Sequence, residues 1–179
     1  MLVFVNLDCM LPAGPDAASP DEGLGVSAFE SVLDAWPQLR VVITSELRYR
    51  MTIEQLRAIF SARCRQRVIA TSLLYGALAQ GATLTREQEI LDWLRHADAP
   101  HADWLALDKP GVEFQLHADR LVACARFDRP ALARLHAHLL QRAMRQEAVV
   151  SVDVDVGADA QGLAFGVLTQ PAGTLDLVL

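Results

Sequence analysis

The sequence predicts an α/β protein: a three-layer, Rossmann-like fold in which a parallel sheet is flanked by helices. Short apolar runs alternate with longer segments of helical periodicity, which is typical of parallel strands joined by helical crossovers. Polar side chains directly follow three of these runs, where the carboxyl ends of parallel strands open into a ligand-binding crevice. The 179 residues, 52% of them hydrophobic, are enough for one domain with a full core.

The first apolar run leads directly to polar side chains. In the stretch Leu2–Leu11, apolar residues give way to Asn6 and Asp8, which are spaced two apart. A strand buried on both faces of a parallel sheet is apolar throughout, and its carboxyl end projects side chains into the crevice. Asn6 and Asp8 are therefore candidate site residues. The Pro- and Gly-rich segment 12–25 is predicted to be a loop, either a flap over the site or a flexible connection.

Two further predicted strands also end in polar residues. The strand expected at 39–44 ends in Thr44 and Ser45, with Arg48 just beyond, and the strand expected at 103–108 ends in Asp108. Hydroxyl groups beside a guanidinium suit a phosphate or another oxyanion, although alone they are more typical of ordinary strand-end chemistry. Further strands are predicted at 68–71 and 121–125.

Four helices are predicted from apolar periodicity and capping side chains. They are expected at 27–36 with Ser27 and Glu30 as a capping pair, from Thr52 with Glu54 and Gln55 close behind, at 85–95 with Thr85 and Gln88, and at 128–144 with Asp128. Arg86 lies in the first turn of the third helix, where a cation opposes the helix dipole. Such a placement is a mild functional hint, and a merely exposed residue is the alternative.

The tail differs from the rest of the chain. Residues 148–156 alternate between apolar and polar with period two, and residues 162–168 do so more loosely. This pattern predicts a C-terminal β-hairpin or meander that ends with the run 174–179. We therefore expect a domain at 1–146 and a β extension at 147–179 packed on it. The alternative is that these strands pair edge to edge in a homodimer.

Charge and composition exclude several classes of protein. A net charge of −6 argues against bulk nucleic-acid binding. The three cysteines, Cys9, Cys64 and Cys124, are far apart and are predicted to be reduced thiols in a cytoplasmic protein. The start of the sequence lacks the basic region of a signal peptide, and no apolar segment is long enough to span a bilayer, so no membrane partner is expected.

Several motifs together resemble a known family. They are the opening run to Asp8, the segments Thr44–Arg48 and Arg86–Leu94, and the run Trp104–Asp108. In this order they resemble haloacid dehalogenase-like (HAD) phosphohydrolases, and most closely the small uncapped group found as a domain in bacterial RNA-repair proteins. The similarity covers roughly residues 1–142. It implies a HAD-like fold without a large cap.

The resemblance also implies roles for the site residues. The position of Asn6 normally holds the aspartate that attacks phosphorus and helps bind Mg²⁺, and Asp8 would be the general acid and base. Asn6, Asp8 and Asp108 would hold Mg²⁺ if the site is active, and no cofactor is expected otherwise. Thr44, Ser45, Arg48 and Arg86 would bind the phosphoryl oxygens. The implied ligand is a phosphorylated small molecule or a nucleic-acid end.

Two residues depart from the family pattern. Asn6 is neutral and a much poorer nucleophile than a carboxylate, so the phosphoaspartyl route is not available. Lys109 stands where a second acid is often found, and both changes weaken a site for Mg²⁺, which prefers anionic oxygen ligands.

The sequence therefore predicts a degenerate site with a binding or regulatory role. The alternatives are an active phosphatase or phosphotransferase with an unusual nucleophile, such as water activated by Asp8, an Asn6 introduced to trap a substrate, or an assembly protein that dimerises through its C-terminal strands.

Overall fold

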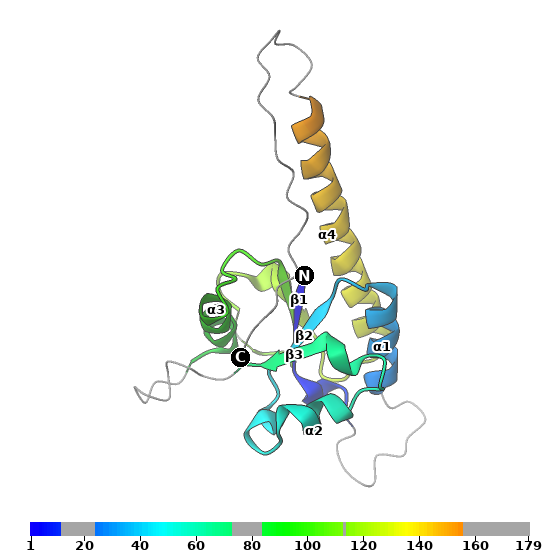
Figure 1. Ribbon diagram of the computed structural model, residues 1–179, viewed down its shortest axis with the longest axis vertical. Helices are drawn as coiled ribbons and strands as arrows, with labels where there is room; N and C mark the ends of the chain where they lie inside the picture. Colours follow the sequence, from blue (N-terminus) through cyan, green and yellow to red (C-terminus); the bar gives the residue numbers. More distant parts are fainter. Residues whose placement is uncertain (12–23, 73–83, 113, 156–179) are drawn as a thin grey trace. The chain divides into compact units, whose positions relative to one another are not determined.

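Five parallel strands form the central sheet, as the sequence predicts (Figure 1). The computed structural model describes residues 1–11, 24–72, 84–112 and 114–155, and the side chains among them up to residue 145. The strand order is β3-β2-β1-β4-β5. The strands are β1 (Leu2–Val5), β2 (Arg40–Ile43), β3 (Val68–Thr71), β4 (Trp104–Asp108) and β5 (Leu121–Ala123).

Four α-helices and four short 3₁₀ segments connect the strands in the described residues. The α-helices are α1 (Gly25–Ala35), α2 (Ile53–Ala58), α3 (Arg86–His96) and α4 (Arg129–Asp155). The 3₁₀ segments are η1 (Leu7–Cys9), η2 (Glu46–Tyr49), η3 (Arg65–Arg67) and η4 (Ala118–Arg120). None of the helices in this part of the chain is both long and apolar enough to cross a membrane. The chain divides into two compact units, Met1–Leu140 and Gln141–Leu179.

The sheet of the first unit is covered on both faces, which gives three layers. Because side chains alternate along a strand, successive residues of β1 and β4 point to opposite faces. One face packs against α1, α2 and the start of α4, through buried residues that include Val3, Val41, Leu105, Phe29, Leu56 and Leu135. The other face packs against α3, through Phe4, Val42, Ala106, Ile90, Trp93 and Leu94. The strands are therefore apolar on both sides until they end.

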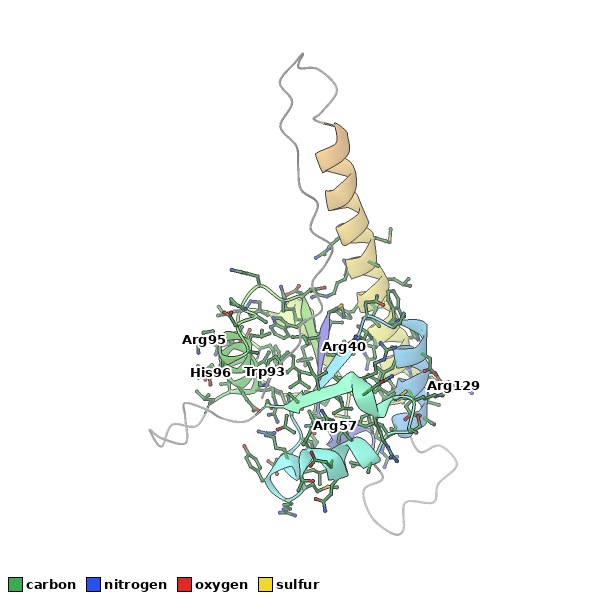
Figure 2. The ribbon with its side chains drawn as sticks, in the orientation of Figure 1. Arg40, Arg57, Trp93, Arg95, His96 and Arg129 are labelled. Atoms are coloured by element: carbon green, nitrogen blue, oxygen red, sulfur yellow. The ribbon has the colours of Figure 1, made fainter. Side chains whose placement is uncertain are left out.

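Helix α3 is amphipathic and well capped. Trp93 lies toward the sheet and meets Phe4 edge to face with ring centroids 5.4 Å apart, whereas Arg95 and His96 lie on the outer side (Figure 2). Thr85 and Gln88 form the predicted capping box, and Thr52 forms the same arrangement at α2. These caps determine where the helices begin, and so the position of Arg86 beside the end of the sheet.

Two predictions from the sequence are wrong. Helix α1 begins at Gly25 rather than being capped by Ser27, and the Glu30 carboxylate instead accepts the backbone N–H of Ser61 at 2.5 Å. Helix α4 continues to Asp155, so residues 148–155 are helical and not a strand. Asp128 caps this helix as predicted, accepting the Ala131 N–H at 2.8 Å. Of the loop predicted at 12–25, residues 12–23 lie outside the described residues, and Gly25 already belongs to α1. The predicted strands beyond residue 155 also lie outside the described residues.

Glu87, in the first turn of α3, holds the segment before β5. Its buried carboxylate accepts the backbone N–H groups of Gln115, Leu116 and His117 at 2.7–3.2 Å and contacts His117 Nδ1 at 2.9 Å. Burial alone would raise the pKa of Glu87, but the hydrogen bonds from His117 and from these backbone groups outweigh it and lower the pKa. The ionised carboxylate therefore ties α3 to the segment that leads into η4.

Glu87→Ala is expected to lower the free energy of unfolding by about 2 kcal/mol, because several backbone donors lose their acceptor. Since the pKa is lower in the folded state, this contribution is present above the unfolded pKa of about 4.3 and is lost as the pH falls through the folded value. Urea denaturation of both proteins between pH 7 and pH 3 measures this, and the difference between them should shrink at acid pH. Glu54→Ala, at an exposed carboxylate in α2, is the matched control. An equal effect of the two substitutions would contradict the assignment.

Candidate functional site

The register of the sheet brings the predicted site residues to one edge. Val5 is paired with Ile43 on β2 and with Leu107 on β4. The residues that follow them are Asn6, Thr44 and Asp108, and the ladder continues through the hydrogen bonds Asn6 N–H to Leu107 O and Thr44 N–H to Val5 O, both 2.9 Å long. Strand β1 has β2 on one side and β4 on the other, so Asn6 and Asp108 lie at a topological switch point, where α/β sheets bind ligands.

Asn6 is buried and held at both ends of its amide. Its Oδ1 accepts the backbone N–H of Asp8 at 3.1 Å and so caps η1, and its Nδ2 donates to Asp108 Oδ1 at 2.7 Å. A backbone donor on one side and a carboxylate on the other allow only this orientation of the amide. The Asn6 side chain is therefore fixed as a structural hydrogen-bonding group.

Asp8 is the partly exposed acid of the site. Ser45 Oγ donates to its Oδ1 at 2.8 Å, and Lys109 Nζ donates to its Oδ2 at 3.1 Å. Lys109 is the single lysine of the chain. The hydrogen bond to Asp8 raises the pKa of Lys109 despite an opposing effect of desolvation, so the ammonium remains charged at neutral pH.

Asp108 is almost completely buried. Its Oδ1 accepts the Asn6 amide and the backbone N–H of Lys109, the latter at 2.8 Å, and its Oδ2 accepts Arg86 Nε at 2.8 Å. The ion pair with Arg86 provides the opposite charge that a buried carboxylate requires. It also explains a cation in the first turn of a helix, because Arg86 is positioned for Asp108 and not for the helix dipole.

Behind Arg86 lies a second ion pair that the sequence did not predict. Glu89 is buried and contacts Arg86 on one oxygen, while its other oxygen lies 2.9 Å from Arg48 Nη2 and accepts the Ser72 hydroxyl. Ser72 follows β3, and its N–H donates to Ile43 O at 2.9 Å. The position of Glu89 three residues after Arg86 was the signal available in the sequence, since residues i and i+3 of a helix are neighbours.

Arg48 and Thr44, both predicted to bind phosphate, are buried in this network. Arg48 donates to the backbone oxygens of Thr44 and Ser45 and, through Nη2, to the Tyr49 hydroxyl at 2.8 Å. Its guanidinium also lies over the Tyr49 ring, 4.5 Å from the centroid. Arg48 therefore fastens η2 to the end of β2 and orients Ser45 toward Asp8.

Cys9, next to Asp8 in the chain, is not activated as a nucleophile. All three cysteines are buried free thiols. A hydrogen bond with Cys124, together with burial, raises the pKa of Cys9, so its reactive thiolate form is disfavoured.

The residues present do not fit Mg²⁺ well. Every side-chain oxygen of Asn6, Asp8 and Asp108 accepts a hydrogen bond from the protein, and each carboxylate already has a cation beside it. Among the described residues, no group of three or more His, Cys, Asp or Glu side chains is arranged to hold a metal ion. Mg²⁺ binds anionic oxygens in a nearly octahedral shell. Here Lys109 and Arg86 already neutralise the carboxylates of Asp8 and Asp108.

Comparisons with known proteins agree with this architecture. A family model for the HAD domain in Swiss Army Knife RNA repair proteins matches residues 11–128. The matched range begins after Asn6 and Asp8 and includes Thr44, Arg86 and Asp108. Searches of curated proteins and of solved structures found no match. The family match covers more than half of the chain, and the chain therefore belongs to the HAD domains of the kind found in Swiss Army Knife RNA repair proteins.

Proposed function

We propose that this chain is a HAD-family protein that has lost covalent phosphoryl transfer and uses its crevice to bind a phosphorylated ligand, in a binding or regulatory role. The observation that carries the proposal is the amide of Asn6, fixed between the Asp8 N–H and the Asp108 carboxylate. A neutral amide oxygen that already accepts a hydrogen bond has no means of attacking phosphorus. The fold is retained while the nucleophile is absent.

The charges around the crevice support the same conclusion. The carboxylates that would serve as acid, base and metal ligands are paired with Lys109 and Arg86. Breaking the buried Arg86–Asp108 pair is costly, because it leaves a buried charge without its partner. The half-exposed Lys109–Asp8 pair is worth less, because solvent screens it. The chemistry that remains is recognition of an anion by the exposed ammonium of Lys109 at the strand ends. The ligand class is a phosphorylated small molecule or a nucleic-acid end.

A phosphatase panel with a Mg²⁺ titration tests this function. We expect the unmodified protein to give no Mg²⁺-dependent release of phosphate from any phosphomonoester in the panel. The Asn6→Asp variant is assayed in parallel, and gain of activity there would indicate that only the nucleophile is missing. Clear turnover by the unmodified protein, abolished by Asp8→Ala, would overturn the proposal in favour of a phosphatase that uses an unusual nucleophile.

The binding role also requires the strand ends to be held in place, which makes Glu89 a structural residue. Glu89→Gln is expected to lower the free energy of unfolding by about 3 kcal/mol, because the guanidinium groups of Arg48 and Arg86 lose a buried counter-charge. The control is Asp34→Asn in the Arg63–Asp34 pair, which has a similar distance of 3.0 Å but side chains that are 65% and 45% exposed. Its cost should be below about 1 kcal/mol. Chemical denaturation compares the two, and equal effects would exclude the structural role of Glu89.

A further inference from the structure

We propose that the ammonium of Lys109 takes the place of the divalent cation in this crevice, so that a phosphoryl group binds here without Mg²⁺. The inference rests on the proposed function, because it concerns how the same site holds its ligand. It goes beyond the loss of a nucleophile, since it assigns a positive role to a residue that departs from the family pattern.

The first support is that the side-chain oxygens expected to bind the metal already accept hydrogen bonds from the protein. The resemblance implies that Asn6, Asp8 and Asp108 would be the ligands of the ion. Here the Asn6 oxygen accepts the Asp8 N–H, the Asp8 oxygens accept Ser45 and Lys109, and the Asp108 oxygens accept Asn6, Arg86 and the Lys109 backbone. A divalent ion would have to compete with these donors for the same lone pairs.

The second support is the balance of charge. Asp8 is paired with Lys109, Asp108 with Arg86, and Glu89 with Arg48 as well as Arg86. Each carboxylate of the network therefore has a cation of its own. A divalent cation would enter a region without excess negative charge and next to fixed positive groups, which disfavours its binding.

The third support is the difference in exposure between the two cations next to the crevice acids. The Arg86 side chain is only 15% exposed and is held from both sides by Asp108 and Glu89, whereas the Lys109 side chain is 51% exposed. An ammonium has three N–H donors, and the contact described for Nζ is the one with Asp8. Lys109 can therefore present a charged donor to a phosphoryl oxygen while it still neutralises Asp8, which are the two electrostatic tasks of the missing ion.

Lys109 also provides its own probe, because the chain contains no other lysine. Protein grown with ¹³C-labelled lysine carries the label in this one side chain, so its NMR signals report on the crevice alone. We expect inorganic phosphate to shift the Lys109 signals in the presence of EDTA. Mg²⁺ alone, at millimolar concentration, should leave them unchanged.

Calorimetric titration with inorganic phosphate gives the quantitative test. For the unmodified protein, the dissociation constant in EDTA and in Mg²⁺ should agree within about twofold. Lys109→Met should weaken binding by about tenfold or more, the loss expected for one charge-assisted hydrogen bond. Arg129→Met, which removes an exposed cation at the start of α4 (Figure 2), is the matched control and should leave binding unchanged.

A double variant that restores the family residue at position 6 and removes the Lys109 cation tests the converse. Asn6→Asp combined with Lys109→Asn returns a carboxylate and removes the cation, so Mg²⁺ should now raise the melting temperature and phosphate binding should require the metal. If this double variant does not fold, the titrations of the unmodified protein and of Lys109→Met still test whether Lys109 binds phosphate without Mg²⁺.

The proposal is overturned if Mg²⁺ alone shifts the Lys109 signals, if phosphate fails to bind in EDTA, or if Lys109→Met binds phosphate as tightly as the unmodified protein. None of these measurements depends on turnover. Phosphatase activity would therefore overturn the proposed function separately.

Discussion

The hydrogen bond between the Asn6 amide and the Asp108 carboxylate, 2.7 Å long, is the contact on which the rest of the site depends. It joins the ends of β1 and β4 at the switch point of the sheet, where a HAD phosphohydrolase places two carboxylates around a metal ion. Two carboxylates so close repel each other unless a cation lies between them. With an amide in one position the contact becomes attractive without a metal, because Nδ2 donates to the acid. The amide of Asn6 thus stabilises the strand ends without a bound metal.

The neighbouring contacts follow from this one. Asp108 remains a buried anion, so it needs a cation, and Arg86 supplies it from the first turn of α3. The guanidinium of Arg86 then needs its own counter-charge, which Glu89 provides, and Glu89 in turn holds Arg48 and Ser72. In this way the carboxyl ends of β1, β2, β3 and β4 are connected through side chains. The hydrogen bonds and charges of a buried network depend on one another, so loss of one member affects the others.

Much of this arrangement could be predicted from the sequence. The contacts that could not be predicted depend on tertiary packing or on competition between helix and strand. The uninterrupted apolar run before Asn6 and the polar residues after β2 and β4 indicated a doubly covered parallel sheet and its crevice, because both follow from local pattern. The partner of Glu30 could not be predicted, since the N–H of Ser61 is brought to it by tertiary packing. The prediction of a strand at 148–156 is wrong for another reason. Alternating Val and Asp residues fit a strand, but α4 is already nucleated at Arg129, and extending a helix costs far less than starting a new element.

The balance of charge also supports the proposed binding role over catalysis. An enzyme accelerates a reaction only through interactions that strengthen in the transition state, such as those between fixed charges and the charge that develops on phosphorus and its oxygens. In this crevice the strongest charges are directed at one another: Arg86 at Asp108 and Glu89, and Arg48 at Glu89. They stabilise the fold whether or not a ligand is present, and they change little as a bound phosphate reacts. Among the charged side chains described in this network, that of Lys109 is the most exposed. In the proposed role this one ammonium would recognise a phosphoryl group in place of the metal, but it supplies neither the carboxylate nucleophile nor the free acid that transfer requires.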